Sequence, residues 1–176
     1  GLSDFRFTLG NAAYLRATMR DVALNDADDA ALQEAIRRKN TPALTQLLDT
    51  LDLDMDHKRA LAQLPILWGN VDVLDRAVCV NDEARAAVER LRDVVVRLAQ
   101  FDLQDFVTLD LAENRGMAYY TGVLFEGFVQ GLGFAVASGG RYDNLIAHFG
   151  HDIPAVGFAI GVERVMMSLR QAQGNV

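Results

Sequence analysis

Apolar residues between positions 11 and 100 recur at intervals of three and four, which is the spacing of one face of an α-helix. This pattern predicts helices over residues 11–24, 28–39, 41–51, 56–64 and 70–78. Thr41 is expected to cap the third of them, with Pro42 in its first turn. A long helix is predicted to begin at Asn81, with these residues facing inward: Ala84, Ala87, Val88, Leu91, Val94 and Leu98.

The pattern changes on both sides of this helical region. Residues 4–9 alternate polar and apolar side chains, which predicts a strand with one buried face, ended by Gly10. Residues 105–161 are expected to be mostly strand, with strands at 122–129 and 134–138 joined by a glycine-rich turn. A first strand needs a sheet to join, and the next strands are predicted about a hundred residues later. The chain is therefore expected to begin inside a domain and to be a fragment.

Several segments that contain or end at a glycine follow in the last third of the chain. Gly139-Gly140 is expected to let the backbone approach a ligand closely. Residues 141–149 show helical spacing and are followed by Gly150, whereas 156–160 predict a short strand. Helical spacing returns at 163, so Arg164 should lie in the first turn of a helix. An arginine at a helix N-terminus suits an anionic group.

Composition narrows the class of protein. The chain of 176 residues has a net charge of −7 and no cluster of lysine and arginine, which argues against tRNA as the main partner. Its single cysteine, Cys79, excludes an internal disulfide and favours a reducing cytoplasm. No apolar run has membrane-spanning length, so no membrane association is expected. No metal site is predicted, because Gly150 interrupts the helical face between His148 and His151 and no third ligand is nearby, and no cofactor is predicted either.

Three motifs occur in order within residues 115–164. They are Arg115-Gly116-Met117-Ala118-Tyr119-Tyr120-Thr121-Gly122, then Ser138-Gly139-Gly140-Arg141-Tyr142-Asp143-Asn144-Leu145, and finally Pro154-Ala155-Val156-Gly157-Phe158-Ala159-Ile160-Gly161-Val162-Glu163-Arg164. Together they resemble the histidine-specific part of class II aminoacyl-tRNA synthetases, where histidyl-tRNA synthetases carry R-G-L-D-Y-Y, G-G-R-Y-D and G-Φ-E-R. The chain is more similar to a related family, the regulatory subunits of ATP phosphoribosyltransferase, which favour Y-Y-T-G.

The resemblance implies an α+β fold, in which the antiparallel sheet of the class II synthetase core carries a mostly helical N-terminal insertion. Residues 1–10 would be a core strand, 11–100 the helical insertion and 101–176 the C-terminal part of the core. It also implies a histidine-binding pocket formed by Arg115, Tyr119, Tyr120, Gly139, Gly140 and Tyr142. Arg164 would hold a nucleotide-like anion. Considered singly, the tyrosines also fit ordinary half-buried sheet positions, and Arg164 fits a surface ion pair.

By this resemblance the chain would come from a non-catalytic, cytoplasmic regulatory subunit that acts in the first step of histidine biosynthesis. Its expected partners are the short-form catalytic subunit of ATP phosphoribosyltransferase, a second copy of itself, and histidine as effector. One departure concerns catalysis, because Ala118 stands where the synthetase motif has aspartate. Two alternatives remain: a catalytic-core fragment of a histidyl-tRNA synthetase, and a synthetase-like partner-binding module with a non-functional pocket.

Overall fold

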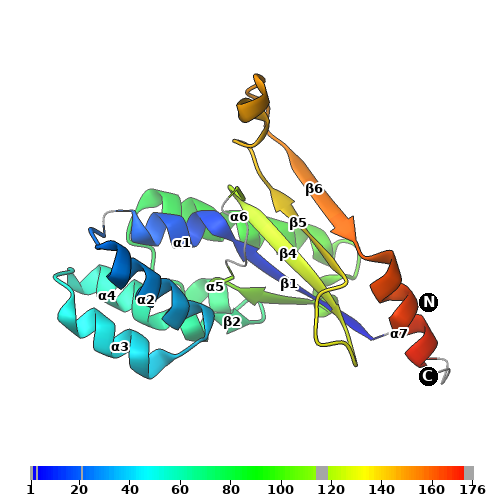
Figure 1. Cartoon of the computed structure of the whole chain (residues 1–176), viewed down its shortest axis with the longest axis horizontal. Helices are drawn as coiled ribbons and strands as arrows, with labels where there is room; N and C mark the ends of the chain where they lie inside the picture. The colour runs from blue at the N-terminus through cyan, green and yellow to red at the C-terminus, as the bar shows by residue number, and fades with distance from the viewer. Residues whose placement is uncertain (1, 3, 21, 114–118, 173–176) are drawn as a thin grey trace.

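The structure is a computed structural model that describes residues 2, 4–20, 22–113 and 119–172. Within these residues a six-stranded sheet has the order β2-β3-β1-β4-β5-β6 (Figure 1). The strands are β1 (Phe5–Asn11), β2 (Trp68–Gly69), β3 (Val107–Asp110), β4 (Val123–Val129), β5 (Ala137–Arg141) and β6 (Val156–Ile160). Neighbouring strands are antiparallel, except that β1 and β3 are parallel.

The described helices gather mainly at one end of this sheet, and α7 lies at the other end beyond β6 (Figure 1). They are α1 (Ala12–Met19), α2 (Asp26–Arg37), α3 (Thr41–Thr50), α4 (Met55–Gln63), α5 (Val73–Arg76), α6 (Asp82–Ala99) and α7 (Val162–Ala172). Short 3₁₀ turns lie at Leu64–Ile66, Gln104–Phe106 and Ile146–Phe149. The helices predicted between residues 11 and 100, the first strand and the last helix are thus confirmed, with bounds that differ by a few residues.

Asparagine and aspartate side chains begin most of the helices of the N-terminal region. Asn25, Asn40, Asp54 and Asn81 each accept a hydrogen bond from a backbone N–H of the first turn. This satisfies donors that have no partner inside the helix. The prediction that Thr41 caps α3 is wrong by one residue, because Asn40 provides the side-chain acceptor and Thr41 is already helical.

The core lies between these helices and the β1–β3 half of the sheet. Tyr14 and Leu15 of α1 are buried against α4 and α6, and Leu9 and Leu109 extend the same cluster into the sheet. Asn11 joins the two layers. Its side-chain oxygen accepts from the Ala13 N–H at 3.1 Å and its amide donates to the Ala87 carbonyl of α6 at 2.9 Å. The site described below therefore rests on a strand whose end is fixed to two helices.

Two segments differ from their predicted structure. The strand predicted at 134–138 lies later, as β5, so Gly139 and Gly140 are part of the strand and not a turn after it. The helix predicted over 141–149 is wrong, because only a 3₁₀ turn forms at its end. The Tyr142 N–H donates to the Ala155 carbonyl at 2.8 Å, and this bond holds residue 142 beside the chain just before β6. Gly150 has φ 92° and ends the turn as expected.

The strand register separates the sheet into two faces. Leu124 and Glu126 of β4 lie opposite Gly140 and Ser138 of β5, and their side chains share one face. Phe125 lies opposite Gly139 and belongs to the other face, where α6 packs. β6 ends the sheet, and its alternate residues Val156, Phe158 and Ile160 are all exposed. None of the described helices is both long and apolar enough to cross a membrane.

Candidate functional site

Three tyrosines form a cluster on the face of the sheet that carries Glu126. Tyr119 and Tyr120 precede β4, and Tyr142 follows β5, so the β4–β5 pairing brings together segments twenty residues apart. The ring centroids of Tyr119 and Tyr120 are 4.8 Å apart, and the Tyr119 ring meets the Tyr142 ring edge-on at 5.6 Å. Tyr120 and Tyr142 complete the triangle at 6.4 Å. All three rings are half-buried and therefore reachable by a small ligand.

Glycines on two neighbouring strands provide the space for two of these rings. A methyl group on Gly140 would lie 2.7 Å from a carbon of the Tyr120 ring, which is closer than real contacts allow. A methyl group on Gly157 would overlap the Tyr142 hydroxyl. Gly139 faces the opposite side of the sheet, where Phe158 covers it. Of the two glycines predicted to line the pocket, only Gly140 therefore faces the tyrosines, and it contacts a ring there.

Burial and neighbouring groups raise the pKa of Tyr120 to about 12. Loss of hydration is the largest cause, followed by a hydrogen bond with Tyr119 and by the charges of Tyr119, Tyr142 and Glu126. Tyr120 therefore keeps its proton throughout the physiological pH range. A neutral phenol both donates and accepts hydrogen bonds, which matches the two ring nitrogens of an imidazole.

The backbone beside the cluster is attached to α1. Arg16 donates from Nη2 to the Tyr120 carbonyl at 2.6 Å, and the Ala12 N–H donates to the Gly122 carbonyl at 3.0 Å. These bonds hold the residues on both sides of Thr121 against the first helix. The helical region and the tyrosine cluster are consequently in direct contact.

The structure describes only one of the two arginines that are predicted to bind anions. Arg115 lies outside the described residues. Arg164 is in the first turn of α7, as predicted, and is exposed. Its guanidinium donates to the Ala135 carbonyl and lies 5.1 Å from the centroid of the Phe134 ring. Arg164 follows the end of β6 that is remote from Gly157 and Tyr142, so it is not part of the tyrosine cluster.

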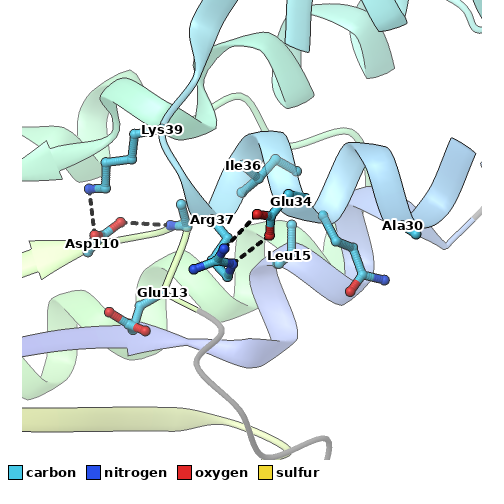
Figure 2. A pocket seen from close by; sticks show the side chains of 10 residues that line it. Leu15, Ala30, Glu34, Ile36, Arg37, Lys39, Asp110 and Glu113 are labelled. Carbon is cyan, nitrogen blue, oxygen red and sulfur yellow. Dashed lines mark hydrogen bonds and ion pairs between the residues drawn. The ribbon is translucent and has the colours of Figure 1, made fainter. Parts of the chain in front are cut away.

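The cavities found elsewhere in the described part of the chain are not lined by these tyrosines. A groove of about 1000 Å³ lies on the opposite face of the sheet, between α6 and β4–β6, with Val94, Phe125 and Phe158 among its walls. A cavity of about 330 Å³ lies beside α2 and the end of β3 (Figure 2). Two ion pairs line it, Glu34 with Arg37 and Lys39 with Asp110, and Glu113 is a further charged residue of its wall. No cluster of three metal-ligating side chains occurs in the described part of the chain.

Sequence reasoning missed three contributors to the site. Gly157 lies in the short strand predicted over 156–160, and that pattern does not indicate that it makes room for the Tyr142 hydroxyl. Glu126 lies in the strand predicted over 122–129 and Arg16 in the helix predicted over 11–24, and neither is among the predicted site residues. The alternation of β4 was the available signal for Glu126, because it places that carboxylate on the same face as Gly140.

The sequence model of the family described as histidyl-tRNA synthetase matches residues 1–165. The chain therefore belongs to this family, as its three motifs indicated. Curated relatives include the ATP phosphoribosyltransferase regulatory subunit of Syntrophotalea carbinolica, which is 41% identical over 96% of this chain and 40% of that protein. The protein of the same description from Caldanaerobacter subterraneus is 36% identical over 99% of this chain and 47% of that protein. The chain thus spans less than half the length of these relatives.

Solved structures confirm the fold. A protein of Bacillus halodurans described as an ATP phosphoribosyltransferase regulatory subunit/histidyl-tRNA synthetase superposes with a TM-score of 0.84 at 29% identity, over 96% of this chain and 45% of that one. A chain of the ATP phosphoribosyl transferase (HisG:HisZ) complex from Thermotoga maritima superposes with a TM-score of 0.67 at 16% identity, over 90% of this chain and 53% of that one. The second likeness concerns the fold alone. The α+β class predicted from the motifs is thereby confirmed.

Proposed function

We propose that this chain is the effector-binding part of an ATP phosphoribosyltransferase regulatory subunit. In this role it binds free histidine on the tyrosine face of the sheet and performs no catalysis of its own. Its partners are the short-form catalytic subunit, which it activates and makes sensitive to histidine, and a second copy of itself. It acts in the cytoplasm, without tRNA and without a cofactor.

The observation that carries this proposal is the convergence of Tyr119, Tyr120 and Tyr142 over Gly140 and Gly157. Two neutral phenols from different segments can hydrogen-bond the two nitrogens of an imidazole and reject apolar rings of similar size. Arg115 is assigned to the carboxylate of the ligand, and Arg164 to an anion at the far end of β6. The names of the relatives support the regulatory role, and the protein from Thermotoga maritima is described as a complex of two components.

Calorimetric titration of histidine into the full-length gene product that contains these residues tests the pocket. Losing one hydroxyl that contacts a buried polar ligand group costs about 1–3 kcal/mol, so Tyr142→Phe should weaken histidine binding roughly five- to hundredfold. Tyr14→Phe is the matched control, because the Tyr14 hydroxyl bonds the Val78 carbonyl within the helical core at 2.9 Å. The control should lower stability and leave the affinity for histidine unchanged. Equal binding by wild type and Tyr142→Phe would defeat the assignment.

A second assay separates this function from that of a synthetase. The synthetase motif has an aspartate where this chain has Ala118. We therefore expect no histidine-dependent exchange of pyrophosphate into ATP. Exchange by the purified protein would favour the synthetase alternative. Activation of the short catalytic subunit by the added protein, reversed by histidine, is the result that supports a regulatory subunit.

A further inference from the structure

Hydrogen bonds around Thr121 join the two tyrosine-bearing segments. The Thr121 N–H donates to the Arg141 carbonyl at 2.7 Å, and the Asp143 N–H donates to the Thr121 hydroxyl at 2.9 Å. Thr121 thus contacts the residues on both sides of Tyr142. It also directly follows Tyr120 in the chain. No other described residue hydrogen-bonds both neighbours of Tyr142 in this way.

An ion pair between Arg141 and Asp143 also lies where the two tyrosine-bearing segments meet. Arg141 donates from Nε to the Asp143 carboxylate at 2.7 Å, and the Arg141 side chain packs against Gly122. The hydrogen bond from Arg141 is the largest cause that lowers the pKa of Asp143 below its ordinary value. Asp143 is therefore ionised at neutral pH. Its ion pair with Arg141 helps to keep the Asp143 N–H beside the Thr121 hydroxyl. On the other side, α1 holds the carbonyls of Tyr120 and Gly122.

From this geometry we infer that Thr121 is a positioning residue for the histidine pocket, because its hydroxyl sets the place of Tyr142 relative to Tyr120. This inference rests on the proposed function for its ligand. The Thr121 hydroxyl accepts from the Asp143 N–H at 2.9 Å and donates to the Arg141 carbonyl at 3.4 Å, so both of its contacts are to the neighbours of Tyr142 and it acts through the tyrosines. A side chain without that acceptor leaves the N–H unpaired in a half-buried place and loosens the Tyr142 segment.

The test compares Thr121→Val, which keeps the branched shape and loses the hydroxyl, with Thr121→Ser, which keeps the hydroxyl. Thr50→Val is the matched control, because the Thr50 hydroxyl donates to the Leu47 carbonyl at 2.7 Å in α3, away from the tyrosines. Histidine is titrated into the full-length gene product by calorimetry. We expect Thr121→Val to weaken binding about fivefold or more, and both Thr121→Ser and Thr50→Val to bind like wild type.

A second measurement needs no ligand. In wild type with labelled tyrosines, nuclear magnetic resonance should give cross-relaxation between the Tyr120 and Tyr142 rings and slow exchange of the Asp143 amide proton. Thr121→Val should lose both signals, and Thr121→Ser should retain them. If the valine variant does not fold, Thr121→Ala against Thr121→Ser gives the same comparison.

The outcomes of these measurements distinguish the proposed histidine binding from the positioning role of Thr121. Failure of wild type to bind histidine overturns the proposed function, and the ring contact and the amide exchange then decide the role of Thr121 alone. Wild-type affinity in Thr121→Val, with the ring contact preserved, overturns the positioning role. A loss of affinity shared equally by the valine and serine variants also overturns it, because the hydroxyl would then not be the operative group.

Discussion

Lys39 has a left-handed backbone conformation with φ 53° and follows Arg38, the residue that caps the C-terminus of α2. Its N–H donates to the Ile36 carbonyl, and the N–H of Asn40 donates to the Ala35 carbonyl, both at 2.9 Å. These two bonds are the usual way to end a helix, and glycine usually occupies the position of Lys39. An L-residue there costs about 1–2 kcal/mol relative to the right-handed conformation. The lysine is therefore expected to offset this cost through its side chain.

Figure 2 shows where that side chain goes. Lys39 Nζ lies 2.6 Å from the Asp110 carboxylate, whose other oxygen accepts from the Ala112 N–H at 3.1 Å. The same Nζ lies 5.4 Å from the centroid of the Trp68 ring. The Asp110 side chain is 12% exposed and that of Lys39 is 38% exposed, so the pair lies between a surface ion pair and a buried one. We expect it to contribute about 1–2 kcal/mol.

Three variants at position 39 divide this contribution between backbone and side chain. Lys39→Met keeps the L-backbone and most of the stem but removes the charge, so it should be less stable than wild type by about 1–2 kcal/mol. Lys39→Ala and Lys39→Gly lose the same contacts and differ only in the backbone. Glycine removes the left-handed strain and adds freedom to the unfolded chain. Lys39→Gly should therefore be more stable than Lys39→Ala by about 0.5–1 kcal/mol.

Urea unfolding followed by circular dichroism measures these differences, and thermal unfolding should show roughly 2–4 °C per kcal/mol for a chain of this size. Gly131→Ala is a suitable control, because Gly131 also has positive φ, at 88°, and lies in the turn after β4. It should destabilise the chain without affecting the ion pair. An alanine variant at position 39 that equals or exceeds the glycine variant in stability would refute the assigned left-handed strain.

Three further predictions concern the site and the sheet edge. Gly157→Ala should displace the Tyr142 hydroxyl, leaving the thermal midpoint nearly unchanged while histidine affinity falls about tenfold by calorimetry, and unchanged affinity would contradict it. The pKa of Asp143 is lower in the folded chain than its ordinary value of about 4, so its stabilisation is complete above that pH and is lost as the pH falls through the lower folded value. Asp143→Asn should therefore flatten the acid limb of stability measured by urea unfolding. The 176-residue chain should self-associate through the exposed β6 edge in light scattering, and Phe158→Lys should reduce this, whereas a monomeric wild type at high concentration would count against it.

Local pattern predicted most elements because their causes are local. The apolar spacing of α6 and its Asn81 cap are both within a few residues of sequence, and both were confirmed. The helix predicted over 141–149 did not form because Arg141 still belongs to β5 and the next two residues are bonded to distant segments of the chain. Tyr142 donates to Ala155, and Asp143 donates to Thr121. Periodicity contains no information about such tertiary partners, which outweigh a weak helical preference.

The candidate site likewise has features that local sequence predicts and features that depend on tertiary contacts. The motifs identified the tyrosines, because their residue types are distinctive in sequence. They could not tell which of Gly139 and Gly140 faces the tyrosines, since this depends on the register of β5 against β4. Nor could they predict a lysine in left-handed conformation at position 39. That choice makes sense only once Asp110 and Trp68 are known to lie beside it.

The position of Arg164 was predicted correctly, but its contacts decide whether it can bind an anion. Its place in the first turn of α7 was predicted from the sequence, and that place favours an anion. Its guanidinium already donates to the Ala135 carbonyl and lies over the Phe134 ring. A guanidinium has five N–H donors in one plane, so this contact leaves donors for a phosphate or carboxylate. The Ala135 bond orients the plane beforehand, which lowers the entropy cost of binding. An anion held here would lie at the opposite end of β6 from Tyr142, in a place separate from the tyrosine cluster.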